Sequence, residues 1–212
     1  MEYNHTHHTH RANRFQKLKT SSPTELAITL AAAKRQLRIE ADETHYDLDI
    51  IELIRAATDY VERRTNLTMI NTTFTAKWLR FPSCQLCLPG YPIASIQSVQ
   101  YYSVAGVLTT LAAYQESLAS KPAYIQYDID TDWPDTQDER IDAVQVAYTA
   151  GYGTDYTTVP FQCAQIIKLI VAHWFRNREA VLSNATSKEI EIGVKALIYS
   201  VQANEFQEFA QQ

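Results

Sequence analysis

Two helix-like patterns of apolar residues lie in the first third of the chain, after residue 21. Ser22-Pro-Thr-Glu25 has the form of a capping box with proline at the first helical position, and apolar residues then repeat every three or four positions. This spacing predicts a first helix that runs to about Arg38. After an acidic break over 40–49, a second helix is predicted to end at Asn66, because asparagine tolerates the left-handed conformation that ends helices. Its apolar face consists of Ile50, Ile54, Ala57 and Val61.

The period changes from helix-like to strand-like at Thr72. Apolar and polar residues then alternate in two stretches, around Phe74 and from Val144 to Tyr148, which is the pattern of half-buried strands. Between them lie shorter apolar segments that prolines and glycines separate. These segments are 86–88, 96–102 and 124–127. Residues 72–150 therefore predict a compact antiparallel β unit.

A third helix is predicted after the last strand. Gly151 and Gly153 permit the turn that ends the alternation, and Pro160 is at a position that a first helical turn accepts. Phe161 to Leu182 then repeats apolar residues at helical spacing. A polar joint follows, and residues 189–212 form a last amphipathic segment.

Together these patterns predict an α+β fold: a helical connector core of about four helices with a small antiparallel β insert between the second and third helices. We expect a flexible N-terminal arm over 1–21, a helical core from 22–71 and 154–212, and an inserted β subdomain over 72–153. The arm is expected to be flexible because it holds histidines and basic residues with almost no apolar periodicity.

Composition and charge exclude several classes of protein. With 212 residues, 46% hydrophobic and 20% charged, the chain suits a soluble globular protein with one core or two small ones. A net charge of -5 gives no electrostatic basis for binding nucleic acid, because neutralising phosphates needs a basic surface. The apolar runs are too short for a bilayer. Three cysteines without a signal-peptide pattern argue against a disulfide framework, so we expect reduced thiols, a cytoplasmic setting and no membrane segment.

Cys84 and Cys87 have the spacing of a zinc knuckle. A structural zinc site needs four ligands, and no second pair or Cys/His partner lies at suitable spacing. A redox motif would open a helix after a strand, whereas these cysteines lie between Pro82 and Pro89. The histidines at 5, 7, 8 and 10 are irregularly spaced and also lack a second ligand cluster. We interpret the two cysteines as strand residues and predict no metal site.

An acidic segment over 128–139 shares part of the pattern of a calcium-binding loop. Carboxylates occupy its first, third, fifth and twelfth positions, which carry ligands in an EF-hand. They are Asp128, Asp130, Asp132 and Glu139. The sixth position, however, is Trp133 where the motif needs glycine, and Pro134 follows it. We interpret the segment as an acidic solvent loop, and the alternative function is a monomeric module that binds calcium or another small ligand there.

His173, near the end of the third helix, is the residue that most invites a catalytic interpretation. A lone histidine on a helix is more often a packing or ion-pair residue, and no nucleophile, phosphate loop or paired cysteine supplies it with a partner. We predict no catalytic residue, no cofactor and no enzymatic activity.

Several short segments carry a resemblance to a known family, in unbroken order over roughly residues 24–182. They include Leu30 to Arg38, Val61 to Asn66, Leu88 to Ile93, Ser98 to Tyr101, Trp133-Pro134, Val144 to Gly153 and Leu169 to Ala180. In this order they resemble the head-to-tail connector, or adaptor, family of long-tailed bacteriophages and related gene-transfer agents.

The resemblance implies a structural virion protein that does no chemistry. Members form a ring, commonly a dodecamer, that docks beneath the portal at the capsid vertex. The implied partners are further copies of the chain, the portal protein and the next neck or tail component, and double-stranded DNA passes through without specific binding. An acidic ring suits this passage, since it presents few phosphate-binding cations. The implied location is the virion neck, after synthesis in the host cytoplasm.

Two sets of residues are expected to make contacts. Trp174, Arg176, Arg178 and Glu179 end the third helix and are subunit-interface candidates, because arginine pairs carboxylates bidentately at interfaces. A solvated helix end is the alternative. The resemblance also implies that the C-terminal segment reaches the portal, although residues 189–212 depart from the family's pattern, so these contacts follow from position alone. The portal-contact candidates are Leu197, Ile198, Tyr199, Val201, Phe206 and Phe209.

Overall fold

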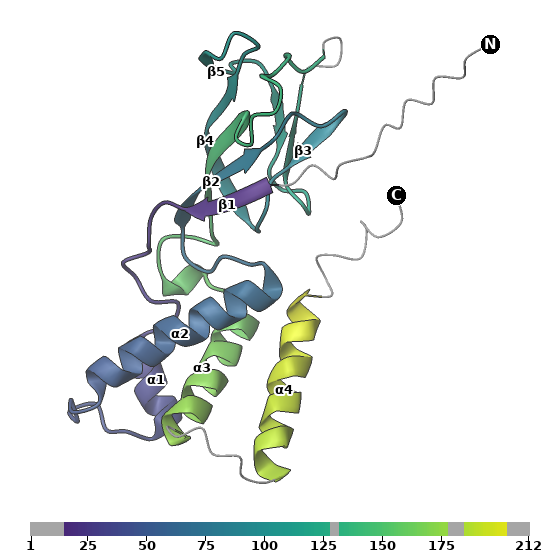
Figure 1. The fold of residues 1–212 in the computed structure, drawn as a ribbon. Helices are drawn as coiled ribbons and strands as arrows, with labels where there is room; N and C mark the ends of the chain where they lie inside the picture. Colours follow the sequence, from purple (N-terminus) through teal and green to yellow (C-terminus); the bar gives the residue numbers. More distant parts are fainter. Residues whose placement is uncertain (1–14, 128–131, 178–184, 203–212) are drawn as a thin grey trace.

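The protein has two lobes, one of strands and one of helices, stacked along its long axis (Figure 1). The structure is a computed structural model that describes residues 15–127, 132–177 and 185–202. Within these residues the chain passes between the lobes three times, after the first strand, after the second helix and before the third helix.

The larger sheet of the strand lobe is antiparallel, with the strand order β1-β2-β8-β4-β5. Its strands are β1 (Phe15–Lys19), β2 (Thr72–Trp78), β4 (Ile93–Tyr102), β5 (Leu108–Thr110) and β8 (Val144–Ala150). β2 and β8 pair over their whole length, with Thr72 opposite Ala150, and buried side chains alternate with half-buried ones in both strands. The alternation predicted for these two stretches is therefore confirmed.

A second, three-stranded sheet has the order β3-β7-β6 and packs its buried residues into the same core. Its strands are β3 (Gln85–Cys87), β6 (Gln115–Ser117) and β7 (Tyr124–Gln126). Tyr148 lies at the centre of this core, and its hydroxyl donates a hydrogen bond of 2.7 Å to the carbonyl of Pro89. Burial raises the pKa of Tyr148 well above its usual value.

The helical lobe has a separate hydrophobic core. Its helices are α1 (Leu30–Leu37), α2 (Asp47–Thr65), α3 (Phe161–Arg176) and α4 (Ala185–Gln202), and a short 3-10 turn, η1 (Tyr156–Thr158), precedes α3. Asn66 caps α2 with a φ of 59°, as predicted from its tolerance of the left-handed conformation. The fully buried core side chains include Ile50, Ile54, Val61, Met69, Ile166, Ile167 and Val171.

The predicted fold class is wrong because it underestimates the β structure relative to the helices. Over the described residues, eight strands in two sheets build a lobe with its own core, so the β part is not a small insert in a helical core. The strand content was underestimated for two physical reasons. β5 and β6, with three residues each, are too short to display alternation, and β1 comes from a segment that precedes the helices.

Residues 15–21, which the sequence placed in the expected arm over 1–21, join the edge of the larger sheet. Phe15 to Lys19 pair with β2, and Thr20 then donates from its backbone nitrogen to the carbonyl of Thr73 at 2.9 Å. Ser21 accepts from the backbone nitrogen of Thr73, also at 2.9 Å. These bonds hold the chain extended where it leaves the sheet.

The predicted start of the first helix is also wrong. α1 begins at Leu30 and not at the capping box, and its N-cap is Thr29, whose hydroxyl accepts from the backbone nitrogen of Ala32 at 3.1 Å. The capping box at 22–25 lies in the connection from β1, directly after residues that bond to β2. Contacts with a distant strand therefore override the local helix signal.

The connections between the lobes are themselves bonded to one another. The backbone nitrogen of Asn71 donates to the carbonyl of Gly153 at 2.8 Å, and that of Tyr152 donates to the carbonyl of Met69 at 3.3 Å. Gly151 has a φ of +145°, and a Cβ built on it would lie 2.5 Å from the nitrogen of Asn71. Only glycine fits this crossing without strain.

Two of the charged residues at this junction are partly buried, Lys17 and Glu62. The ammonium nitrogen of Lys17 lies 4.0 Å from the centre of the Phe74 ring, and burial lowers the pKa of Lys17. Glu62 accepts a hydrogen bond of 2.7 Å from the backbone nitrogen of Met69. Burial nevertheless raises the pKa of Glu62, because desolvation disfavours its carboxylate form.

Candidate functional site

The predicted subunit-interface residues lie at the end of α3. The Trp174 ring is half-buried and meets the Tyr60 ring of α2 edge-on, with centroids 6.0 Å apart. Arg176 is exposed in the last turn. Arg178 and Glu179 lie outside the described residues.

A cavity of about 300 Å³ opens between α2, α3 and α4 beside Trp174, and we name it the α4 cavity. Its lining is Tyr60, Arg64, Ile170, His173, Trp174, Val194 and Lys195. The guanidinium carbon of Arg64 lies 5.4 Å from the centre of the Tyr60 ring, so an aromatic wall orients one of the basic groups. Two cations and a histidine line this cavity, and none of the described lining residues is a carboxylate. The α4 cavity therefore favours an anionic group.

The predicted portal-contact residues are distributed around α4. Leu197 and Tyr199 are 37% and 67% exposed, and Val201 is half-buried. Ile198 is only 6% exposed and packs in the helical core, so it holds α4 to the lobe and offers no surface to a partner. Phe206 and Phe209 lie outside the described residues.

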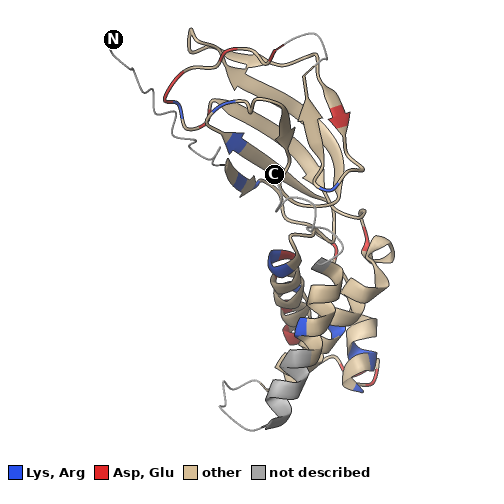
Figure 2. Ribbon diagram, turned by 90° about the vertical axis from the view of Figure 1, so that its right-hand side faces the viewer, with Lys and Arg blue, Asp and Glu red and all other residues tan. Residues whose placement is uncertain are grey.

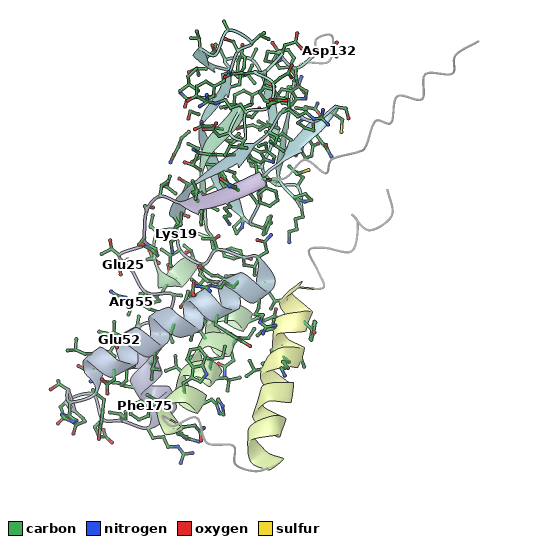
Figure 3. The ribbon with its side chains drawn as sticks, viewed as in Figure 1. Lys19, Glu25, Glu52, Arg55, Asp132 and Phe175 are labelled. Carbon is green, nitrogen blue, oxygen red and sulfur yellow. The ribbon has the colours of Figure 1, made fainter. Side chains whose placement is uncertain are left out.

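The loop between α1 and α2, residues 38–46, is a charged projection built around Lys34. The ammonium nitrogen of Lys34 lies 2.6 Å from a carboxylate oxygen of Asp47, and it donates to the carbonyls of Glu43 at 2.7 Å and Ala41 at 3.3 Å. The Tyr46 ring, at the end of the loop, packs edge-on against Phe175 of α3, with centroids 5.5 Å apart. Phe175 is labelled in Figure 3. We name this segment the acidic α1–α2 loop, because its exposed carboxylates are Glu40, Asp42 and Glu43.

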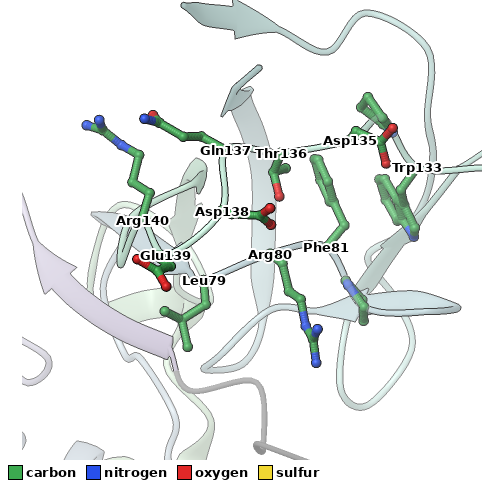
Figure 4. A pocket seen from close by; sticks show the side chains of 12 residues that line it. Leu79, Arg80, Phe81, Trp133, Asp135, Thr136, Gln137, Asp138, Glu139 and Arg140 are labelled. Carbon is green, nitrogen blue, oxygen red and sulfur yellow. The ribbon is translucent and has the colours of Figure 1, made fainter. Parts of the chain in front are cut away.

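A second cavity, of about 480 Å³, lies on the β lobe (Figure 4). The Phe81 and Trp133 rings form part of its wall and stack at 4.4 Å with an angle of 6° between them. The Trp133 indole nitrogen donates to the carbonyl of Cys84 at 3.1 Å, which fixes the ring. Charged side chains of both signs line the rest, among them Arg80, Asp135, Asp138, Glu139 and Arg140. Because both charges are present, this cavity favours neither an anionic nor a cationic ligand.

A third cavity, of about 500 Å³, lies between the lobes. Lys19, Glu25 and Arg55 line it from the end of β1, the connection and α2 (Figure 3). Asp59 and Glu62 complete its charged lining, so opposite charges face one another across this junction.

The sequence motifs for metal binding receive no support from the part of the chain that the structure describes. Asp128 and Asp130 of the calcium-like segment lie outside it, and within it no group of three or more His, Cys, Asp or Glu side chains could hold a metal ion. Cys87 belongs to β3, and Cys84 lies exposed just before that strand. Burial raises the pKa of the Cys87 thiol, which makes it less reactive.

His173 contacts Asn177 at the end of α3. The imidazole Nδ1 of His173 lies 3.2 Å from the side-chain amide nitrogen of Asn177, and the same amide donates to the His173 carbonyl at 2.9 Å, so these contacts cap the end of α3.

None of the helices, over the residues described, combines the length and apolar character needed to cross a membrane.

Sequence reasoning singled out Trp174 and His173 separately, but it did not find the α4 cavity. Tyr60 and Arg64 on α2 and Lys195 on α4 approach them only after the helices pack. A one-dimensional pattern has no signal for such a cluster.

Comparisons with known proteins support the resemblance, although the predicted balance of helices and strands was wrong. No family model matches the chain, and no curated protein matches it. A chain from the neck of an empty gene transfer agent (GTA) particle, computed with C6 symmetry, has a TM-score of 0.75 and 23% identity, covering 88% of this chain and 95% of that one. A chain from the virion of a native GTA particle has a TM-score of 0.70 and 22% identity, covering 88% and 95%. A chain from the neck of a native GTA particle, computed with C12 symmetry, has a TM-score of 0.70 and 21% identity, covering 88% and 94%. The resemblance is thus confirmed at the level of the fold.

Proposed function

We propose that this chain is a structural component of the neck of a virion or gene-transfer-agent particle and is not an enzyme. The observation that supports this proposal best is the extent of the shared fold. With a TM-score of 0.75 over 88% of this chain and 95% of a neck chain, the match includes both lobes. Few residues of this chain lie outside the shared fold, so little structure remains that could form a site with a different activity.

We further propose that the chain forms a homo-oligomeric ring, with a dodecamer as the expected state. The neck structures of similar fold were computed with C6 and C12 symmetry. A ring of identical subunits needs two different complementary faces on each copy. The helical lobe offers charged positions of both signs for such faces (Figure 2).

The proposed partners in the particle follow from the placement of the helices. We assign the ring body to 22–71 and 154–212, with 72–153 as a separate subdomain that carries β2 to β8 and pairs with β1. Leu197, Tyr199 and Val201 on α4 are the described candidates for portal contact, and the next neck component is proposed to bind the opposite end. Trp174 and Arg176, with Arg178 and Glu179, stay proposed subunit contacts.

The channel of the proposed ring would carry double-stranded DNA without holding it. A chain with a net charge of -5 supplies few cations to neutralise phosphates, and that neutralisation provides most non-specific affinity for DNA. The proposed location is the neck at the head–tail junction of a particle, after synthesis in the host cytoplasm.

Deleting the gene in a producing bacterium tests the proposed function. We expect DNA-filled heads that lack tails by electron microscopy, with tailed particles restored by the intact gene. Gold-labelled antibody against the chain should mark one vertex of complete particles. Tailed, infectious or gene-transferring particles from the deletion strain would refute the proposal.

A further inference from the structure

We propose that the acidic α1–α2 loop of one copy binds in the α4 cavity of the next copy. This inference rests on the proposed ring and identifies one contact that would close it. The occupant is a second copy of this chain, and the recognised chemistry is a pair of carboxylates on a short loop.

The α4 cavity has the chemistry to receive carboxylates. Arg64 and Lys195 are exposed at its rim, and His173 lies half-buried in the wall. Arginine offers several donors in a planar fork, and lysine adds a compact positive charge. The Tyr60 and Trp174 rings restrict water on one side, which strengthens charge pairing relative to an open surface. A volume of about 300 Å³ suits one or two side chains and not a folded domain.

The acidic α1–α2 loop has the complementary charge and a fixed shape. Its carboxylates at Glu40, Asp42 and Glu43 are exposed, whereas its backbone is held from beneath by Lys34. Glu43 also accepts from the backbone nitrogen of His45 at 3.0 Å, which tightens the turn. A loop that is already ordered loses less conformational entropy when it binds.

The two surfaces lie on opposite sides of the helical lobe. In Figure 1 the α1–α2 connection projects at the lower left, beyond the start of α2, and α4 forms the right-hand side of the same lobe. One chain therefore cannot place its own loop in its own cavity. Contacts between unlike faces repeat from copy to copy and generate a ring when the rotation closes.

Zero-length cross-linking with a carbodiimide tests the contact directly. This reagent joins a carboxylate to an amine in contact with it, so the expected product is an amide between the Lys195 side chain and Glu40 or Asp42. Mixing ¹⁴N- and ¹⁵N-labelled full-length chains at high concentration and low salt shows by mass spectrometry whether the two peptides come from different copies. We expect mixed-isotope pairs, and we expect high salt to suppress them because it screens exposed charges.

Charge reversal adds a matched set of variants. Arg64→Glu should weaken self-association about tenfold, because it turns attraction into repulsion at an exposed site. Arg55→Glu is the control, since Arg55 lies nine positions earlier on α2, two and a half turns away, and so faces the opposite side. Combining Arg64→Glu with Glu40→Lys and Asp42→Lys in one chain should restore much of the association.

Three results would overturn the contact. They are the absence of mixed-isotope pairs between residues 40–43 and Lys195, equal effects of Arg64→Glu and Arg55→Glu, and pairs that join Lys195 instead to residues 203–212 of another copy. Each leaves the proposed neck function standing if the deletion strain still lacks tails. Conversely, mixed-isotope pairs from a protein whose deletion leaves tailed particles intact would support the contact and refute the neck function.

Discussion

Replacing Lys34 with methionine tests whether the buried ammonium group of Lys34 holds the acidic α1–α2 loop in its conformation. The Lys34 side chain is 6% exposed, and its ammonium group lies 2.6 Å from Asp47 and bonds to the carbonyls of Glu43 and Ala41. Methionine keeps most of the apolar stem and removes the charge and its donors. The variant therefore isolates the polar contribution of Lys34 from its packing.

The expected loss of stability follows from the burial of each partner. Removing one member of a buried ion pair costs about 3–5 kcal/mol, because the other charge is left unpaired. Asp47 is 26% exposed and recovers part of its hydration, so the lower end of that range, about 3 kcal/mol, applies. For a chain of this length, such a loss lowers the melting temperature by roughly 6–12 °C.

Urea unfolding followed by far-ultraviolet circular dichroism measures this loss, and hydrogen exchange over 40–47 locates it. The control is Lys77→Met, because the nitrogen of Lys77 lies 3.8 Å from a carboxylate oxygen of Asp142 with both side chains about a quarter exposed. That substitution should cost below about 1 kcal/mol. If Lys34→Met costs no more than Lys77→Met, or leaves exchange in the loop unchanged, Lys34 does not organise the connection.

Four further substitutions test other parts of the fold. Gly151→Ala should destabilise the protein by about 2 kcal/mol or more, since its φ of +145° and close backbone neighbour exclude a Cβ; Gly193→Ala, in α4 with open space around it, should instead stabilise by about 0.5–1 kcal/mol in the same thermal melts. Tyr148→Phe should cost about 1–2 kcal/mol, because it leaves the carbonyl of Pro89 without its donor. Because burial raises the pKa of Tyr148, wild-type stability should also fall above about pH 10, where the unfolded phenol ionises, and the phenylalanine variant should show a smaller fall. The raised pKa of Glu62 means that wild-type stability falls as pH rises and its buried carboxyl must ionise. Glu62→Gln cannot ionise, so it should gain stability relative to wild type between pH 4 and pH 7 in urea melts. A difference that stays constant with pH would contradict this.

Regular, one-sided burial made part of the fold readable from the sequence. β2 and β8 each bury one face, so their apolar residues alternate, and α2 combines a continuous apolar stripe with an asparagine stop. β1 has no such signal, because its side chains are exposed or half-buried on both faces. Its position depends on pairing with β2, more than 50 residues further along the chain.

The candidate surfaces were harder to predict than the strands and helices. Lys34 follows Ala33 in the apolar repeat of α1 and reads as an ordinary helix position, yet it holds the loop that follows. Trp174 and Arg64 carry no shared motif, and they line one cavity only because α2 and α3 pack together. Such sites depend on three-dimensional packing, which local periodicity does not encode.

The three connections between the lobes determine how the molecule would respond to force. A domain attached by one linker swings about it, whereas here three segments cross the same plane, and two of them are bonded to each other. A pull on the strand lobe is therefore divided among three peptide segments, and any rotation must shear the backbone bonds at Asn71 and Tyr152 together. We therefore expect the joint to resist bending and torsion more than a single linker would, so that a load on one lobe also moves the other.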